Sequence, residues 1–270
     1  MVSFPNAKIN LGLNVVEKRT DGYHNIETVF VPIFELYDVL EIVESGKTTL
    51  QIFGMEIDGE IENNLIIKAL RLLQKDFKIP ELSCFLKKNI PAGAGLGGGS
   101  ADAAFMLKMV NEKFALNISQ ENLEKYCSKL GADCTFFIRN KPSFARGTGN
   151  ILSDVNLSLQ GKYIVLVKPN ICVSTADAYS KIIPEKWEMP LEDVLQLPIS
   201  EWKNYLFNDF EKNVFAHHPQ LAEIKQQMYN FGAVYTSMSG SGATIFGIFD
   251  KKPNVNFDEM FVFSTQMTRI

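Results

Sequence analysis

The chain has 270 residues, 46% of them hydrophobic and 21% charged, which suits one large or two modest globular domains. The net charge of −4 comes without a basic stripe, so a nucleic-acid partner is not expected, and no apolar run reaches the roughly 18 residues of a membrane helix. The first residues lack a signal-peptide pattern and the four cysteines form no C-x-x-C pair, so we expect a cytoplasmic protein with reduced thiols.

The first predicted element is a strand over residues 7–16. Its apolar side chains alternate with a second face that carries Lys8, Asn10 and Asn14. This polar face is either a solvated sheet edge or part of a functional site, and the alternation alone favours neither.

A turn at Asp21-Gly22 separates this strand from the next apolar positions. Tyr23 and His24 come directly after the turn. An aromatic ring can stack on a planar ligand, and histidine offers both a donor and an acceptor. Such a pair is more often ordinary loop surface.

Residues 38–53 predict two strands with a turn at Ser45-Gly46 between them. An amphipathic helix follows Asn64, which stands where a helix cap is expected. A further strand is predicted over residues 83–90.

The stretch Pro91–Ala104, PAGAGLGGGSADAA, stands between that strand and an alanine-rich helix. Glycine can take positive φ and lets backbone N–H groups gather around an anion. The helix behind it adds unpaired N–H groups and the positive end of its dipole. The order of strand, glycine loop and helix therefore predicts a polyphosphate-binding site rather than a flexible linker.

Two other nucleotide motifs are excluded. Gly93, Gly95 and Gly98 match the G-x-G-x-x-G pattern, but the acidic residue at the required distance, Glu112, follows no second strand. No lysine follows the glycines as a Walker-A motif requires, and the protein-kinase motifs are missing from the sequence.

Ser119 is placed to cap a second helix, which Gly131 ends. Asp133 comes next, just before the apolar run CTFFI. It is either another helix cap or an acid with a chemical role.

The turn-rich residues 140–161 place a domain boundary near residue 155, which gives domains of residues 1–155 and 156–270. The second half opens with a buried strand over residues 162–168, and a capped helix follows that contains Thr175 and Tyr179. Asn208-Asp209 begins another helix, and residues 234–249 predict a strand, a Gly-Ser-Gly turn and a strand. His217-His218 is more typical of a helix surface than of a metal site.

Together these segments resemble the GHMP small-molecule kinases, the family of galactose, homoserine, mevalonate and phosphomevalonate kinases. The similarity runs from Lys8 to Phe249 in the family's order. It rests on GLGGGSADAA, on GAD before FF, on NDFE and on VYTSMSGSGATIFGIF. The stretch RTDGYHNIETVF is similar to the branch of the family that acts on a diphosphocytidyl alcohol.

The resemblance implies roles for particular residues. Lys8 and Asp133 would be the catalytic pair, with Asp133 as general base. Tyr23 would stack on the cytosine and His24 would hydrogen-bond it, while Tyr179 would cover the other face of the base; Asn10 and Thr175 would also contact the substrate. The residues implied to bind ATP are Asn64, Pro91, Ala92, Gly93, Ala94, Gly95, Leu96, Gly97, Gly98, Gly99, Ser100 and Ala101.

The resemblance also implies an α+β fold of two domains, the first like the second domain of ribosomal protein S5 and the second ferredoxin-like. The implied reaction moves the γ-phosphoryl group of ATP to the 2-hydroxyl of 4-diphosphocytidyl-2-C-methyl-D-erythritol, in the non-mevalonate route to isopentenyl diphosphate. Mg²⁺ is expected with ATP, and its protein ligands and the oligomeric state are unknown from the sequence.

Two alternatives stay open. One is a GHMP kinase of the mevalonate or homoserine type, against which the Asp-Gly-Tyr-His stretch argues. The other is a non-catalytic nucleotide-binding protein, against which the presence of both Lys8 and Asp133 argues.

Overall fold

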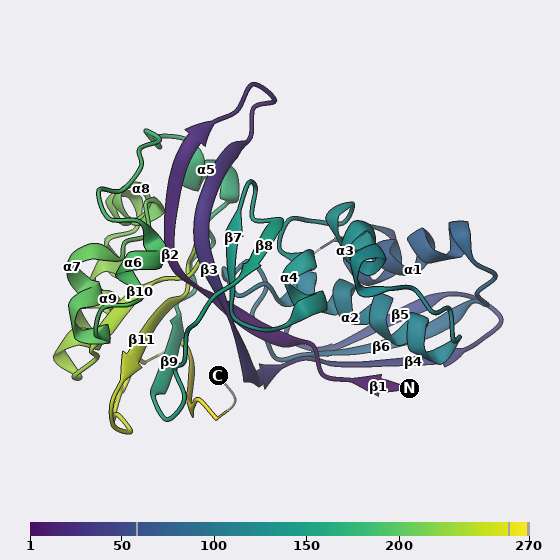
Figure 1. Ribbon diagram of the computed structural model, residues 1–270. Helices are drawn as coiled ribbons and strands as arrows, with labels where there is room; N and C mark the ends of the chain where they lie inside the picture. Colours follow the sequence, from purple (N-terminus) through teal and green to yellow (C-terminus); the bar gives the residue numbers. More distant parts are fainter. Residues whose placement is uncertain (58, 259, 269–270) are drawn as a thin grey trace. The chain divides into compact units, whose positions relative to one another are not determined.

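The computed structural model describes residues 1–57, 59–258 and 260–268 (Figure 1). Its contacts divide the chain into two compact units. The first unit comprises residues 1–7, 32–92 and 97–141, and the second comprises residues 8–31, 93–96 and 142–270. Strands β2 (Asn6–Lys18) and β3 (His24–Tyr37) contribute residues to both units.

The first unit contains a four-stranded sheet in the order β1-β4-β6-β5. Its strands are β1 (Val2–Ser3), β4 (Val39–Glu44), β5 (Thr49–Gly54) and β6 (Leu82–Lys88). All neighbours are antiparallel except β5 and β6, which are parallel. The two strands predicted over residues 38–53 are confirmed, but β6 lies between them, so they do not pair with each other.

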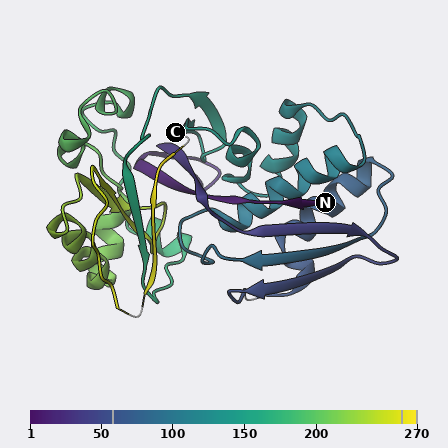
Figure 2. The same ribbon diagram turned by 90° about the horizontal axis from the view of Figure 1, so that it is seen from below.

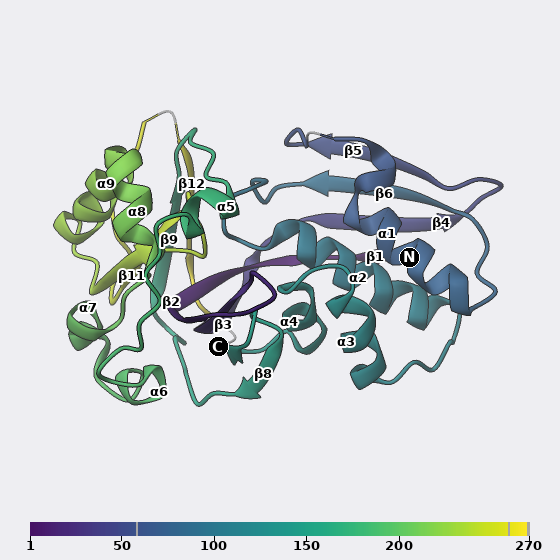
Figure 3. The same cartoon turned by 90° about the horizontal axis from the view of Figure 1, so that it is seen from above.

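Four α-helices cover one face of this sheet, and Figures 1, 2 and 3 all show them on the same side. They are α1 (Leu65–Asp76), α2 (Gly98–Lys113), α3 (Gln120–Ser128) and α4 (Cys134–Arg139), and a 3-10 turn at Ile61–Asn63 precedes α1. Asn64 Oδ1 accepts from the Ile66 amide at 2.9 Å, and Ser119 Oγ accepts from the Asn122 amide at 3.4 Å. Both predicted helix caps are therefore confirmed.

The second unit contains two sheets, in the orders β2-β3-β7-β8 and β10-β11-β9-β12. The strands not yet introduced are β7 (Ser143–Arg146), β8 (Ile151–Asp154), β9 (Tyr163–Lys168), β10 (Tyr235–Met238), β11 (Ile245–Phe249) and β12 (Phe261–Gln266). The pairs β10–β11, β11–β9 and β12–β9 are antiparallel. The strand predicted over residues 162–168 and the strand pair within residues 234–249 are confirmed.

Short helices complete the second unit. They are α5 (Thr175–Tyr179), α6 (Leu191–Val194), α7 (Trp202–Tyr205), α8 (Phe210–His217) and α9 (Pro219–Asn230), with a 3-10 turn at Ile199–Glu201. Helix α9 packs against β10, β11 and α8, and its Leu221 and Ile224 are buried in the core of this unit. Within the described part of the chain, no helix has both the length and the apolar character needed to cross a membrane.

Candidate active site

The polar face of β2 is buried. Lys8 and Asn10 are each 2% exposed and Asn14 is 3% exposed, so the interpretation as a solvated edge is wrong. The Lys8 ammonium donates to Asn10 Oδ1 at 2.5 Å and lies 5.0 Å from the centre of the Phe30 ring. Because burying a charge is costly, a lysine kept in this position points to a function.

Hydrogen bonds fix the orientation of Asn10. Its Nδ2 donates to Thr28 Oγ1 at 3.1 Å, and the Thr28 hydroxyl in turn donates to the Gly12 carbonyl at 2.5 Å. The backbone N–H of Asn10 donates to Ser239 Oγ at 3.2 Å. The amide oxygen of Asn10 is thereby directed at Lys8.

The glycine-loop residues 93–96 rest on the turn between β10 and β11. Ser239 Oγ donates to the Gly95 carbonyl at 2.8 Å, and the Thr244 amide donates to the Ala94 carbonyl at 3.3 Å. A Cβ at Gly95 would lie 2.0 Å from the Ser239 carbonyl oxygen, so only glycine fits there. The Lys8 amide donates to the Leu96 carbonyl at 2.9 Å, which ties the same segment to β2.

Positive φ occurs at only some of the loop glycines. Gly93, Gly95 and Gly97 have φ of 59°, 74° and 72°. Gly98 instead opens α2 in helical conformation, and a Cβ on it would lie 2.9 Å from Ile90 Cγ2. Gly98 is therefore a glycine because it packs closely against Ile90.

The start of α2 offers backbone donors. Gly97 is its N-cap, and the first helical bond runs from the Ala101 amide to the Gly97 carbonyl at 2.9 Å. The N–H groups of Gly98, Gly99 and Ser100 precede that bond and have no partner one turn earlier in the helix. Gly99 is exposed, and the positive end of the helix dipole lies at the same place. This is the geometry that binds anions at helix N-termini.

Asp133 stands at the start of a helix, but its side chain does not act as the helix cap. It occupies the N-cap position of α4 with φ −71° and ψ −18°, a helical conformation rather than the extended one usual for a cap. Within the described residues its side chain makes no capping hydrogen bond. Asp133 belongs to the first unit and Lys8 to the second, so their pairing stays a prediction.

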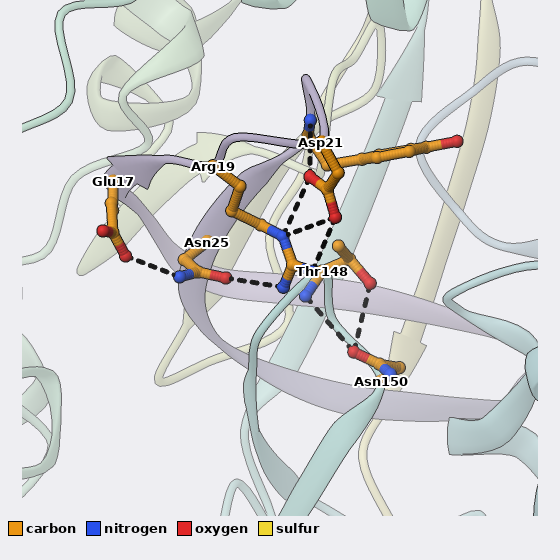
Figure 4. A network of polar contacts seen from close by, with 7 residues as sticks. Glu17, Arg19, Asp21, Asn25, Thr148 and Asn150 are labelled. Atoms are coloured by element: carbon orange, nitrogen blue, oxygen red, sulfur yellow. Dashed lines mark hydrogen bonds and ion pairs between the residues drawn. The ribbon is translucent and has the colours of Figure 1, made fainter.

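The turn between β2 and β3 is held by polar contacts (Figure 4). Arg19 forks onto the Asp21 carboxylate with contacts between 2.6 and 3.1 Å, and Asp21 Oδ1 accepts from the Tyr23 amide at 3.1 Å. Arg19 also donates to Asn25, which donates to Glu17 at 2.7 Å. These contacts link residues within the turn, while Tyr23 is 66% exposed and presents its ring for stacking.

His24 stacks on Tyr179, with the ring centroids 4.7 Å apart and the planes 19° apart. Burial, and secondarily the charge of Lys18, lower the pKa of His24, which favours the neutral ring. Thr175 is exposed at the start of α5, the helix that ends at Tyr179. The face of Tyr179 on which His24 lies is not open to a base in this structure. The predicted role of Tyr179 as a cover for the cytosine stays a prediction.

Sequence reasoning missed a buried ion cluster beside the glycine loop. Lys88 contacts the carboxylates of Asp38 and Asp102. The available signal was Asp102 itself, an acid within an otherwise apolar run at the start of a helix. Asn64 and the remaining loop residues, Pro91 and Ala92, lie in the same unit as this cluster, and their contact with ATP stays a prediction.

Comparisons with known proteins define the class of this chain. Residues 64–141 match the family model "GHMP kinases N terminal domain", and residues 191–258 match "GHMP kinases C terminal". The chain belongs to the GHMP kinase family. The boundary predicted near residue 155 falls between the two matches and stays a prediction.

The names of individual relatives are narrower than that of the family. A Bacteroides fragilis protein named 4-diphosphocytidyl-2-C-methyl-D-erythritol kinase is 54% identical over 99% of this chain and 100% of its own length. A protein of the same name from Parabacteroides distasonis is 53% identical over 98% of this chain and 96% of its own length.

Solved structures confirm the predicted two-domain GHMP kinase fold. The crystal structure of a 4-(cytidine 5'-diphospho)-2C-methyl-D-erythritol kinase matches with a TM-score of 0.77 and 30% identity, covering 92% of this chain and 90% of the other. A homoserine kinase from Cytophaga hutchinsonii matches with a TM-score of 0.62 at 15% identity, covering 97% of this chain and 95% of the other. The second likeness reflects the shared fold.

Proposed function

We propose that this chain transfers the γ-phosphoryl group of ATP to the 2-hydroxyl of 4-diphosphocytidyl-2-C-methyl-D-erythritol, in the cytoplasm, as a step toward isopentenyl diphosphate. The observation that carries the proposal is the 54% identity, over the full length, to a kinase named for this substrate. All four cysteines are free thiols, which agrees with a reducing compartment.

The β2–β3 turn supports a cytidine substrate. Tyr23 is an exposed aromatic ring on a hydrogen-bonded turn, and His24 is a partly buried, neutral donor and acceptor beside it. A ring that stacks and a neighbour that hydrogen-bonds are together what recognition of a pyrimidine base needs. Mevalonate and homoserine have no base for these residues to contact.

The glycine loop and the start of α2 supply the phosphate-binding part of the proposal. Phosphoryl transfer passes through a loose transition state, so catalysis rests on positioning and on neutralising charge. In our account the loop backbone and the N–H groups at the start of α2 hold the phosphates of ATP.

The chemical step is assigned to Asp133 and Lys8. Asp133 accepts the proton of the substrate hydroxyl, whose oxygen bonds to the γ-phosphorus as the bond to the β–γ bridging oxygen breaks and ADP leaves. The Lys8 ammonium is assigned to offset charge on the transferring group.

Mg²⁺ belongs to the proposal as the ion that accompanies ATP. It keeps several waters and binds through nucleotide phosphates with one or two carboxylates, so it does not need a cage made of protein side chains. Among the described residues no cluster of three or more His, Cys, Asp and Glu side chains is placed to hold a metal. We assign no protein ligand to the ion.

A substrate panel tests the proposal. The purified chain is incubated with Mg²⁺, ATP and one alcohol at a time: the diphosphocytidyl alcohol, mevalonate or homoserine. We expect ADP and a phosphorylated product with the first alcohol alone. Transfer to mevalonate or homoserine would replace the substrate assignment, and nucleotide binding without transfer to any alcohol would favour a non-catalytic nucleotide-binding protein.

A further inference from the structure

The ion cluster of Asp38, Lys88 and Asp102 is buried in the first unit. Lys88 Nζ contacts Asp38 Oδ2 and lies 2.9 Å from Asp102 Oδ2. The three side chains are between 0% and 4% exposed. Burying three ionisable groups costs free energy that an apolar trio of the same size would not, so the cluster calls for a reason beyond stability.

The cluster holds the chain directly before the glycine loop. Asp38 Oδ1 accepts the backbone N–H of Asn89 at 2.7 Å and that of Ile90 at 3.0 Å. These two residues immediately precede Pro91. The entry to the loop is therefore fixed by a carboxylate that is itself held by Lys88.

The cluster also holds the chain directly after the loop. Asp102 lies near the start of α2, and its contact with Lys88 ties the beginning of that helix to β6. A Cβ on Gly98 would lie only 3.2 Å from Lys88 Nζ, so the first residue of α2 sits against the lysine head group. The Lys88 ammonium therefore anchors the chain on both sides of the loop, through Asp38 before it and through Asp102 after it.

Of the three residues, Asp102 is the one whose substitution should disturb the remaining contacts of the cluster least. Only its Oδ2 contacts Lys88, and within the described part of the chain no group hydrogen-bonds Oδ1. Burial raises the pKa of Asp102 well above its usual range, although Lys88 opposes that shift. Without Asp102, Lys88 would still pair one-to-one with Asp38.

We infer that Asp38, Lys88 and Asp102 form a positioning cluster, which keeps the glycine loop and the N-terminus of α2 in the geometry that binds a polyphosphate. The identity of that ligand rests on the proposed function. The three side chains act through the loop backbone, by fixing where its N–H groups point, and none of them is a catalytic residue.

The first test compares Asp102→Ala with Asp102→Asn. The probe is a non-hydrolysable ATP analogue with Mg²⁺, and its Kd is measured by calorimetry on the whole chain. We expect Asp102→Ala to raise the Kd roughly tenfold, the size of effect seen for residues that act through a network. Asp102→Asn keeps an oxygen that accepts from Lys88, so it is expected to restore the wild-type Kd.

Val110→Ala is the matched control, because Val110 is buried on the same helix but further from the loop. It lowers stability by removing core methyl groups, and we expect it to leave the Kd unchanged. An equal rise in Kd for Val110→Ala would overturn the inference, as would a wild-type Kd for Asp102→Ala.

Hydrogen exchange on the nucleotide-free protein separates this inference from the proposed function. We expect the amides of residues 91–101 to exchange faster in Asp102→Ala than in wild type or Val110→Ala, with α3 unchanged in all three. Unchanged exchange over residues 91–101 overturns the cluster's role whatever binds to the loop. Failure of the wild-type chain to bind the analogue would instead count against the proposed function alone.

Discussion

The imidazole of His24 lies on the phenol ring of Tyr179, with centroids 4.7 Å apart and planes inclined by 19°. Phe210 meets the same tyrosine edge-on, also at 4.7 Å. His24 belongs to β3 and Tyr179 to the end of α5, so the stack joins two distant parts of the sequence. It restricts the orientation of the imidazole and therefore of the two nitrogens that could meet a base.

The first prediction concerns Tyr179 as the support of His24. Tyr179→Ala removes the ring, and an aromatic pair contributes about 0.5–1.5 kcal/mol, so the KM for the diphosphocytidyl alcohol should rise roughly two- to tenfold. Tyr179→Phe keeps the stack and should leave this KM unchanged. Steady-state kinetics of both variants measure the difference. Equal KM increases in the two variants would show that the hydroxyl, rather than the stack, matters.

The second prediction concerns Tyr23. Tyr23→Ala should raise the KM for the alcohol by roughly ten- to a hundredfold, since stacking on a base is worth about 1–3 kcal/mol. The KM for ATP should not change, and Tyr23→Phe should keep most of the affinity. A parallel rise in both KM values would place Tyr23 outside the cytidine site.

The third prediction is a pH dependence that arises from His24. Its pKa is lowered by burial and by Lys18, so the neutral form, with one donor and one acceptor, prevails at neutral pH. Affinity for the alcohol should therefore be constant above the ordinary histidine value of about 6.5 and should fall as the pH drops through the lowered pKa.

KM measurements across this pH range test the effect of His24 protonation. His24→Gln keeps a donor and an acceptor but does not titrate, so its KM for the alcohol should stay flat where that of the wild type rises. The same rise in the variant would assign the titration to another group.

The fourth prediction contrasts two neighbouring glycines. A Cβ at Gly98 would press on Ile90, so Gly98→Ala should lower the free energy of unfolding by about 1–3 kcal/mol. A Cβ at Gly99 would meet Leu65 Cδ1 at 3.9 Å, an ordinary contact, so Gly99→Ala should raise stability by up to about 1 kcal/mol through helix propensity.

Because Gly99 is exposed, Gly99→Ala also tests whether phosphates bind at the start of α2. If phosphates approach the start of α2, the added methyl group of Gly99→Ala should raise the Kd for ATP several-fold in a protein that is at least as stable as wild type. Denaturant unfolding and calorimetry together measure both effects. A wild-type Kd for Gly99→Ala would remove this part of the helix from the phosphate site.

Local features of the fold were predictable from the sequence. The caps at Asn64 and Ser119 were found because a capping side chain acts on an amide two or three residues away. The glycine loop was found because its strand, turn and helix are consecutive. Its interpretation as part of a small-molecule kinase came from the resemblance.

Non-local features were not predictable. Strand β6 pairs with both β4 and β5 and separates them, although it begins only at Leu82, and the alternation of apolar residues does not reveal this pairing. Asn10 is held by contacts with Thr28 and Ser239, and the Lys88 cluster joins three separate segments. The reason for glycine at position 98 likewise lies in Ile90, outside the loop.

The central claim is that Asp133 takes the substrate proton in phosphoryl transfer. Asp133→Asn keeps the shape of the side chain but cannot accept that proton at neutral pH. Asp193→Asn, which changes an exposed acid on α6, is the control for the substitution itself. Lys8→Met should also slow phosphoryl transfer. The double variant Lys8→Met/Asp133→Asn should lose less rate than the two single losses multiplied together, because in our account the two residues act as one unit.

The most direct measurement is a single-turnover rate with enzyme in excess over labelled ATP and with saturating diphosphocytidyl alcohol. Our account predicts that Asp133→Asn folds, binds ATP with the wild-type Kd and transfers phosphate about 10²–10⁴ times more slowly, whereas Asp193→Asn reacts at the wild-type rate. A folded Asp133→Asn protein that transfers phosphate at nearly the wild-type rate would contradict the account.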